Sequence, residues 1–499
     1  MSTSGSAMRN PIPLPVRSNR SLIAALVLYL GVCSGTYAQV TFQRTYGLDT
    51  IHDYSKCVLP VPGAGYYLAG FQFEFSGNGV EAVLLRINSV GDTLWKKSYL
   101  MPLYVMFQDV IATSNGELVV AGLVNHGSVA GFTYDAYLAK LDTAGNFLWA
   151  TTVGGPYNDW ALQVLETPDG GLVAAGWSAT MSWGDHGAAY LVRLNSAGDT
   201  LWTRTYPNPN PNWYQYAYCV GMMPDSGFVL AGKQSNGSIP QVHVMRTNAQ
   251  GDTLWTKRLD ILDSGEARDV VITDAGNILI TGYCTASGFS NPFLVELDPD
   301  GNLLWTRIYD HAVSGWAFSL CNTTDGYALF GITYQYDLHL INVDLNGDTI
   351  WSRQFAIGDT HDGYSVEQTD DGGFAMTGIS AVFGIGSNPT QMFLIKTDAA
   401  GNVITSTHDI VLDPSFAVTL FPNPTTESAT FQFTTLHAGS FSLRLHDGQG
   451  RVVRSLFESE HRGPGQYAEE VDLSGLARGS YTLVLSNGAR AVSVKVIKN

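Results

Sequence analysis

One phrase of nine residues recurs along the chain and constrains the fold more than any other feature. GDTLWTRTY begins at Gly198, and close variants begin at Gly251, Gly301 and Gly347. The opening glycine occurs in seven repeats, and in six of them a tryptophan follows four residues later. The glycines are Gly91, Gly145, Gly198, Gly251, Gly301, Gly347 and Gly401, and the tryptophans are Trp95, Trp149, Trp202, Trp255, Trp305 and Trp351. Self-similarity at a regular spacing indicates a repeat architecture.

The length of the repeat predicts what each unit builds. A unit of about 50 residues has room for four short strands, which is the size of one β-propeller blade. Composition agrees, because the chain has 53 Gly, 24 Tyr, 22 Phe and 11 Trp residues but only 14% charged residues, which favours short strands and tight turns. We predict an all-β protein in which residues 39–408 form a seven-bladed β-propeller.

The two ends of the repeat array predict how the ring closes. The seventh repeat has Thr405 at the tryptophan position, whereas FQRTY, at Phe42 to Tyr46, matches the part of the phrase after the tryptophan. We predict that this N-terminal strand completes the last blade, which removes an exposed sheet edge. The six tryptophans should pack between blades, because a ligand site need not be copied at every blade.

The N-terminus predicts export. Basic residues precede the apolar run Ser21 to Cys33, and small residues follow up to Ala38, so residues 1–38 are typical of a secretory signal peptide. A lipoprotein signal ending at Cys33 is the alternative, although Val32 is bulkier than such a site favours. No segment is long enough for a transmembrane helix. The net charge of −17 argues against nucleic acid as a partner.

Four cysteines follow the signal. Cys57 and Cys219 occupy the same position in two non-adjacent repeats, so we predict buried thiols there. Cys284 and Cys321, in neighbouring repeats, are the one candidate disulfide.

Two acidic turns bear on metal binding. DPDGN, which begins at Asp298, and DLNGD, which begins at Asp344, resemble calcium loops faintly but lack the remaining oxygen ligands. We predict neither a metal nor a cofactor.

The pattern changes after a linker at 409–416. Apolar residues alternate along residues 417–499, so we predict a small Ig-like β-sandwich there. This segment strongly resembles the type A C-terminal sorting domain of the type IX secretion system of Bacteroidetes. The matching residues are Pro422, Asn423, Pro424, Gly450, Arg451, Leu473, Leu476, Gly479, Tyr481, Lys495 and Lys498. An ordinary adhesive sandwich is the alternative, but it would not combine the PNP start with the Gly-x-Tyr end.

The resemblance implies the route of the protein. The signal peptide would take it across the inner membrane, and the outer-membrane translocon of the type IX machinery would recognise the C-terminal domain. That domain is usually cut off afterwards, so the protein would lie on the outer-membrane surface or in the medium. The repeats resemble those of secreted bacterial seven-bladed propellers, through the DGG turn, YLAKLD and GNFLW, which indicates the fold but no activity.

No local catalytic motif is present: the sequence has no HExxH, GxSxG, Walker loop or CxxC. We therefore predict a non-catalytic binding or adhesion module with a carbohydrate or protein ligand. The alternative is a polysaccharide hydrolase or lyase, because a propeller can assemble its carboxylates from different blades.

Aromatic residues that do not follow the repeat predict the ligand face. Trp160, Trp183, Trp213 and Tyr216 should lie near the entry of the first strands, around the central channel, where a sugar or a peptide would stack on them. The competing interpretation of each residue is packing within the fold.

Overall fold

The computed structural model describes the propeller and the C-terminal domain, with gaps mainly in loops. The described ranges are 40–47, 51–73, 79–100, 104–125, 133–179, 187–210, 213–309, 315–357, 360–381, 390–403, 418–435, 438–447, 451–486 and 491–499. Every helix or strand in these ranges is a β-strand, and none of the described residues form a helix that could cross a membrane. The all-β prediction is confirmed.

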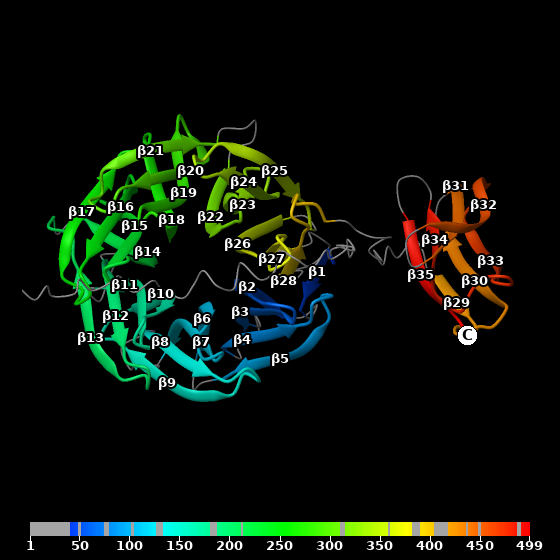
Figure 1. Cartoon of the computed structure of the whole chain (residues 1–499), viewed down its shortest axis with the longest axis horizontal. Helices are drawn as coiled ribbons and strands as arrows, with labels where there is room; N and C mark the ends of the chain where they lie inside the picture. The colour runs from blue at the N-terminus through cyan, green and yellow to red at the C-terminus, as the bar shows by residue number, and fades with distance from the viewer. Residues whose placement is uncertain are drawn as a thin grey trace, which may run out of the picture. The chain divides into compact units, whose positions relative to one another are not determined.

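Seven groups of four antiparallel strands follow one another along the chain and form the blades of a propeller (Figure 1). Five of them are separate sheets, and the first two are joined into one eight-stranded sheet by a single parallel pair, Val80 with Tyr104. The predicted blade number is therefore confirmed. Blade 1 contains β2 (His52–Val61), β3 (Gly65–Phe73), β4 (Val80–Ile87) and β5 (Thr93–Tyr99); blade 2 contains β6 (Tyr104–Ala112), β7 (Leu118–Asn125), β8 (Tyr134–Leu141) and β9 (Phe147–Val153). Blade 3 contains β10 (Asp159–Glu166), β11 (Leu172–Ala179), β12 (Gly187–Leu194) and β13 (Thr200–Tyr206); blade 4 contains β14 (Tyr214–Met222), β15 (Phe228–Ser235), β16 (Gln241–Thr247) and β17 (Thr253–Leu259). Blade 5 contains β18 (Ser264–Ile272), β19 (Ile278–Ala286), β20 (Phe289–Leu297) and β21 (Leu303–Ile308); blade 6 contains β22 (Gly315–Asn322), β23 (Gly326–Thr333), β24 (Leu338–Asp344) and β25 (Thr349–Phe355).

The seventh blade joins the two ends of the ring. It contains β26 (Thr360–Gln368), β27 (Phe374–Ala381) and β28 (Gln391–Lys396), and its outer strand is β1 (Phe42–Tyr46). β1 pairs antiparallel with β28, with Phe42 opposite Lys396. The first strand of each blade contacts that of the next blade, and β26 contacts β2. The predicted closure is confirmed, and the seven first strands surround the central channel.

The outer strands show why the nine-residue phrase recurs. Its glycine takes a positive φ, and the tryptophan of the preceding blade lies against it. A Cβ atom on Gly301 (φ +76°), for example, would lie 2.9 Å from the ring of Trp255. Phe42 lies against Gly91 in the same way, so it occupies the tryptophan position of the seventh blade. The six tryptophans are half-buried and lie between blades, as predicted.

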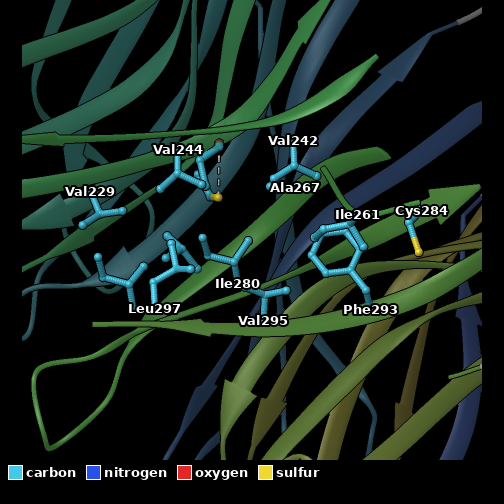
Figure 2. Packing of buried hydrophobic residues seen from close by; sticks show 14 of the residues in the cluster. Val229, Val242, Val244, Ile261, Ala267, Ile280, Cys284, Phe293, Val295 and Leu297 are labelled. Atoms are coloured by element: carbon cyan, nitrogen blue, oxygen red, sulfur yellow. Dashed lines mark hydrogen bonds between the residues drawn. The ribbon is translucent and has the colours of Figure 1, made fainter. Parts of the chain in front are cut away.

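The faces of neighbouring blades bury aliphatic side chains against each other. Figure 2 shows the cluster between blades 4 and 5, in which Val229, Val242 and Val244 lie near Ile280 and Val295. These five side chains are completely buried. Because each blade has such a cluster on both sides, a single blade would leave two apolar faces exposed, and the repeats need one another.

The C-terminal domain is a separate β-sandwich. One sheet has the order β29 (Val418–Phe421), β30 (Ser428–Thr435) and β33 (Gly465–Asp472). The other has the order β32 (Val452–Arg462), β31 (Gly439–His446), β34 (Gly479–Ser486) and β35 (Ala491–Lys498). The alternating residues Phe441, Leu443 and Leu445 are buried between the sheets.

Two alternatives from the sequence are resolved by the geometry. Cys284 and Cys321 are both buried free thiols, so the candidate disulfide is absent; Cys57 and Cys219 are free as well. The turn acids have structural roles, because the Asp298 carboxylate accepts the backbone N–H groups of Asp300 and Asn302.

Candidate functional site

The central channel is the place where all blades contribute side chains to one cavity. Each first strand has a β-bulge at the same point, where the pairing with the second strand shifts by one residue. A bulge turns one extra residue out of the sheet. The seven bulged residues, Lys56, Gln108, Leu162, Tyr218, Arg268, Phe318 and Tyr364, all line a cavity of about 150 Å³.

In five of the seven blades, the side chain of the residue after the bulge accepts a backbone N–H of the next blade. Asp109 Oδ2 accepts the backbone N–H of Val164 at 2.9 Å, and Gln163 Oε1 accepts that of Val220 at 2.6 Å. Three more bonds of this kind run from Leu320 to Asp269, from Val366 to Ser319 and from Val58 to Ser365. These side chains satisfy backbone donors that the bulge leaves without a partner in the sheet.

Blades 1 and 4 have Cys57 and Cys219 after the bulge, and this explains why the next blade has an aspartate at the same position. A thiol is a weak acceptor, so these two blades offer no good partner to Val110 and Val270. Both N–H groups are bonded instead by the carboxylate of the preceding residue, Val110 by Asp109 at 2.8 Å and Val270 by Asp269 at 2.9 Å. Each aspartate thus uses both carboxylate oxygens to accept backbone N–H groups at the boundary between two blades, which we call the seam.

Glu367 is the exception among the channel carboxyl groups. It lines the same cavity and is accessible to solvent there, and it has no hydrogen-bond partner among the described residues. Enclosure by protein, followed by the charges of Asp269 and Asp109, raises its pKa to about 8. Burial likewise raises the pKa of Asp269 to about 6. Glu367 is therefore mostly protonated at neutral pH.

Three cations lie among aromatic rings at the channel, and two of them, Lys56 and Arg268, are bulged residues. The ammonium of Lys56 is 3.6 Å from the ring centre of Tyr364, and the guanidinium of Arg268 is 4.4 Å from that of Tyr218. Glu266 is buried and pairs with both Arg268, at 2.6 Å, and Lys233, at 3.0 Å. Lys56 has no hydrogen bond or ion pair within the described part of the chain. Burial lowers the pKa of Lys56 to about 8. The negative charge of Asp362 acts to raise this pKa, and the positive charge of Arg268 acts to lower it further.

Aromatic residues form a row across blades 2, 3 and 4. The ring of Trp160 lies 6.2 Å from that of Tyr134 and 5.1 Å from that of Trp177. Trp177 in turn lies 5.0 Å from Tyr216, and Tyr216 lies 6.2 Å from Tyr218. We call these five residues the aromatic row; it ends beside Arg268. A row of ring contacts is rigid, and its accessible members offer flat apolar surface.

The four predicted ligand contacts differ in position. Trp160 is half-buried within the aromatic row, whereas Tyr216 is only 8% exposed and mainly supports its neighbours. Trp213 is half-buried just before β14 and contacts no other described aromatic ring. Trp183 lies outside the described residues. Within those residues no group of three His, Cys, Asp or Glu side chains is placed to hold a metal ion.

The predicted sorting residues meet at one end of the C-terminal sandwich. The Asn423 side chain donates to the carbonyl of Lys495 at 2.7 Å and accepts the N–H of Ile497 at 2.8 Å. Lys498 donates to the carbonyls of Leu473 and Leu476 at 2.6 and 2.7 Å. The PNP segment is thus fastened to the last strand.

Other members of the predicted set make local bonds. Tyr481 donates its hydroxyl to the carbonyl of Ala477 at 2.7 Å. Arg451 pairs with Asp447 at 2.8 Å. Pro422 and Pro424 flank Asn423, and Gly479 begins β34. Gly450 lies outside the described residues.

Residues 419–499 match the family of secretion system C-terminal sorting domains. The C-terminal domain is a sorting domain. It directs the protein to export by the type IX secretion system, as the resemblance implied. No curated protein matches the sequence significantly.

Solved propellers resemble the chain at low identity. A puromycin hydrolase is 13% identical with a TM-score of 0.45, over 77% of this chain and 59% of the hydrolase, so the chain spans less than two thirds of that enzyme. Polysaccharide lyase Uly1 is 10% identical with a TM-score of 0.43, over 71% of this chain and 91% of the lyase. Sqt1 from Chaetomium thermophilum is 10% identical with a TM-score of 0.41, over 77% and 94%.

Proposed function

We propose that the exported propeller is a non-catalytic binding or adhesion module whose ligand lies at the mouth of the central channel. The aromatic row is the observation that supports this proposal. It is continuous over three blades, and Trp160 and Trp177 remain partly accessible within it. Flat, rigid rings of this kind bind the apolar faces of sugars, as well as peptide side chains.

A glycan fits the site better than a purely apolar ligand. The channel cavity, which shares Tyr218 with the aromatic row, is lined by Lys56, Arg268 and Gln108, which supply hydrogen-bond donors. A sugar offers both an apolar face and many hydroxyl groups, so it uses rings and polar groups together. We therefore propose a carbohydrate ligand, presented to the propeller at the cell surface or in the medium.

Glycoside hydrolysis is the alternative that the channel supports less well. It needs two carboxyl groups roughly 5–10 Å apart, one acidic and one ionised. Asp109 and Asp269 use both of their oxygens for backbone N–H groups at the seams. Among the described residues of the cavity, Glu367 is then the single carboxyl group available for chemistry.

A glycan array with the purified protein tests the proposal. We expect at least one class of glycan to bind, and Trp160→Ala to weaken it about tenfold, as the loss of one stacked ring would. Phe147→Ala is the matched control, because Phe147 is an exposed ring on the outer strand of blade 2. A glycan that binds Trp160→Ala as tightly as the unchanged protein would refute the proposed site.

A further inference from the structure

The cavity of the central channel contains a cation that forms no ion pair with a described carboxylate. Lys56 projects from the bulge of β2, and none of the described residues gives it a hydrogen bond or an ion pair. Three buried cations of the propeller are paired with carboxylates: Lys396 with Asp371 at 2.9 Å, Arg246 with Asp225 and Lys140 with Glu117 at 3.1 Å. An enclosed ammonium without a partner is costly. A ligand that supplied the missing negative charge would remove that cost.

Arg268 is the second cation of the same cavity. It lies on the bulge of β18, and the charges of Arg268 and Lys56 act on each other. One of its terminal nitrogens is bonded to Glu266, while its Nε is buried without a hydrogen-bond partner. Glu266 also pairs with Lys233, so one carboxylate serves two cations. The charge of Asp362 acts on Lys56, but no ion pair joins them among the described residues, so Glu266 and Asp362 together supply two negative charges beside three positive ones.

The aromatic faces nearest these cations are already occupied. Lys56 covers Tyr364, and Arg268 lies over Tyr218 and within 5.6 Å of the ring centres of both Tyr283 and Phe318. A cationic ligand would have to displace one of them from its ring. An anionic group, in contrast, can approach both cations without disturbing those contacts.

The deeper carboxyl groups do not cancel this preference. Asp109 and Asp269 are each held by two backbone N–H groups, which compensate their charge. Enclosure by protein, with the charges of Asp269 and Asp109, raises the pKa of Glu367 to about 8, which favours its neutral form. The net charge of −17 is spread over the whole chain, and salt at physiological strength screens exposed charges beyond about 8 Å.

We infer that the channel mouth binds an anionic group of a glycan, namely the carboxylate of a uronate residue, between the ammonium of Lys56 and the guanidinium of Arg268. This inference rests on the proposed function and names its ligand class. A cavity of about 150 Å³ is smaller than a typical pocket for a whole ligand, so it suits one sugar unit. Neighbouring units of the chain would lie along the aromatic row, which ends beside Arg268.

Titration calorimetry with two matched probes tests the inference. The first probe is a galacturonate oligosaccharide, and the second is the same oligosaccharide with its carboxyl groups reduced to hydroxymethyl groups. We expect the unchanged protein to bind the charged probe at least tenfold more tightly, as one charge-assisted hydrogen bond would produce. Lys56→Met should abolish this preference, and Lys56→Arg should retain it.

Lys257→Met is the matched control, because Lys257 also lies over a ring, 5.9 Å from the centre of Trp255, but on the outer strand of blade 4. It should bind both probes like the unchanged protein. A sulfated galactan that binds with the same dependence on Lys56, in place of galacturonate, would support the anion site and assign the group as sulfate.

Two results separate this inference from the proposed function. Equal affinity of the unchanged protein for both probes, with binding that depends on Trp160, would overturn the inference and leave the proposed function in place. Failure of every carboxylated and sulfated probe to bind would also overturn the inference. Binding that depends on Lys56 but not on Trp160 would keep the anion site and reject the aromatic row as the ligand surface.

Discussion

The contact between the turn glycine and the tryptophan of the preceding blade makes a quantitative prediction. Gly301 has φ +76°, and a Cβ atom there would lie 2.9 Å from two ring carbons of Trp255. Gly301→Ala therefore combines two costs: about 1 kcal/mol for an L-residue in the left-handed region and about 2 kcal/mol for overpacking against the ring. We expect a total loss of about 3 kcal/mol in the free energy of unfolding.

Gly288→Ala isolates the first cost. Gly288 lies in the same blade with φ +85°, but a Cβ atom there would meet nothing within 4 Å. It should cost about 1 kcal/mol. Trp255→Ala removes a half-buried ring and the bond from its Nε1 to the carbonyl of Pro299, which is 3.2 Å long, and should cost about 2 kcal/mol, less than a fully buried tryptophan.

The double variant completes the cycle. Without the indole ring the close neighbour of that Cβ atom is Lys257 Cε, 3.1 Å away near the end of a flexible side chain, so Gly301→Ala in the Trp255→Ala background should cost about 1 kcal/mol, the same as Gly288→Ala. Denaturant unfolding followed by far-UV circular dichroism measures all four proteins, because the loss of a tryptophan does not affect that signal strongly, and equal m-values make them comparable. Equal costs for Gly301→Ala and Gly288→Ala, or additive effects in the double variant, would refute the proposed reason for the recurring phrase.

Three further predictions concern other parts of the chain. Deletion of residues 417–499 should leave the propeller in the periplasm, as cell fractionation would detect, and delivery of that truncation to the surface would contradict the role of the sorting domain. Glu367→Gln should raise the free energy of unfolding by about 1 kcal/mol above pH 8 and leave it unchanged below pH 4.5. The pKa of Glu367 is about 8 in the folded state and 4.5 ordinarily, so the unchanged protein loses stability as the pH rises from 4.5 to 8. Equal melting temperatures of the unchanged protein and Glu367→Gln at pH 9 would show that Glu367 is not enclosed. Because the four cysteines that follow the predicted signal are free thiols, a reducing agent should not change the melting temperature, and a drop of several degrees would reveal a disulfide.

The sequence predicted the blade number because the packing between blades leaves a trace at each repeat. The turn glycine is required twice, by its positive φ and by the ring against it, so neither Gly198 nor Gly301 is readily replaced. Closure of the ring was predictable because β1 carries part of the recurring phrase. Phe42 takes the ring position itself, which a comparison with Thr405 alone would not have shown.

The channel could not be predicted in the same way. Its lining includes one bulged residue per blade, and these are Lys, Gln, Leu, Tyr, Arg, Phe and Tyr, which follow no single residue type. A bulge changes the direction of a side chain without requiring a particular residue, so Lys56 and Arg268 carry no local motif. The one signal was the position itself, 14 residues before the Ala-Gly end of the second strand, as at Lys56 and Gly70 or Arg268 and Gly282. Aromatic residues such as Trp160 stood out because they are rare, although Tyr216 is almost completely buried.

The bulge also separates two roles that a regular strand would combine. In five of the seven blades, the bulged residue turns toward the channel and the following residue bonds the next blade, as Gln108 and Asp109 or Leu162 and Gln163 do. Loss of a seam acceptor such as Gln163 leaves the buried N–H of Val220 without a partner, which costs about 1–3 kcal/mol. Loss of Leu162 changes only the lining of the cavity. Stability and ligand choice thus depend on adjacent but different residues, so the channel lining can vary from blade to blade while the seams keep the ring closed.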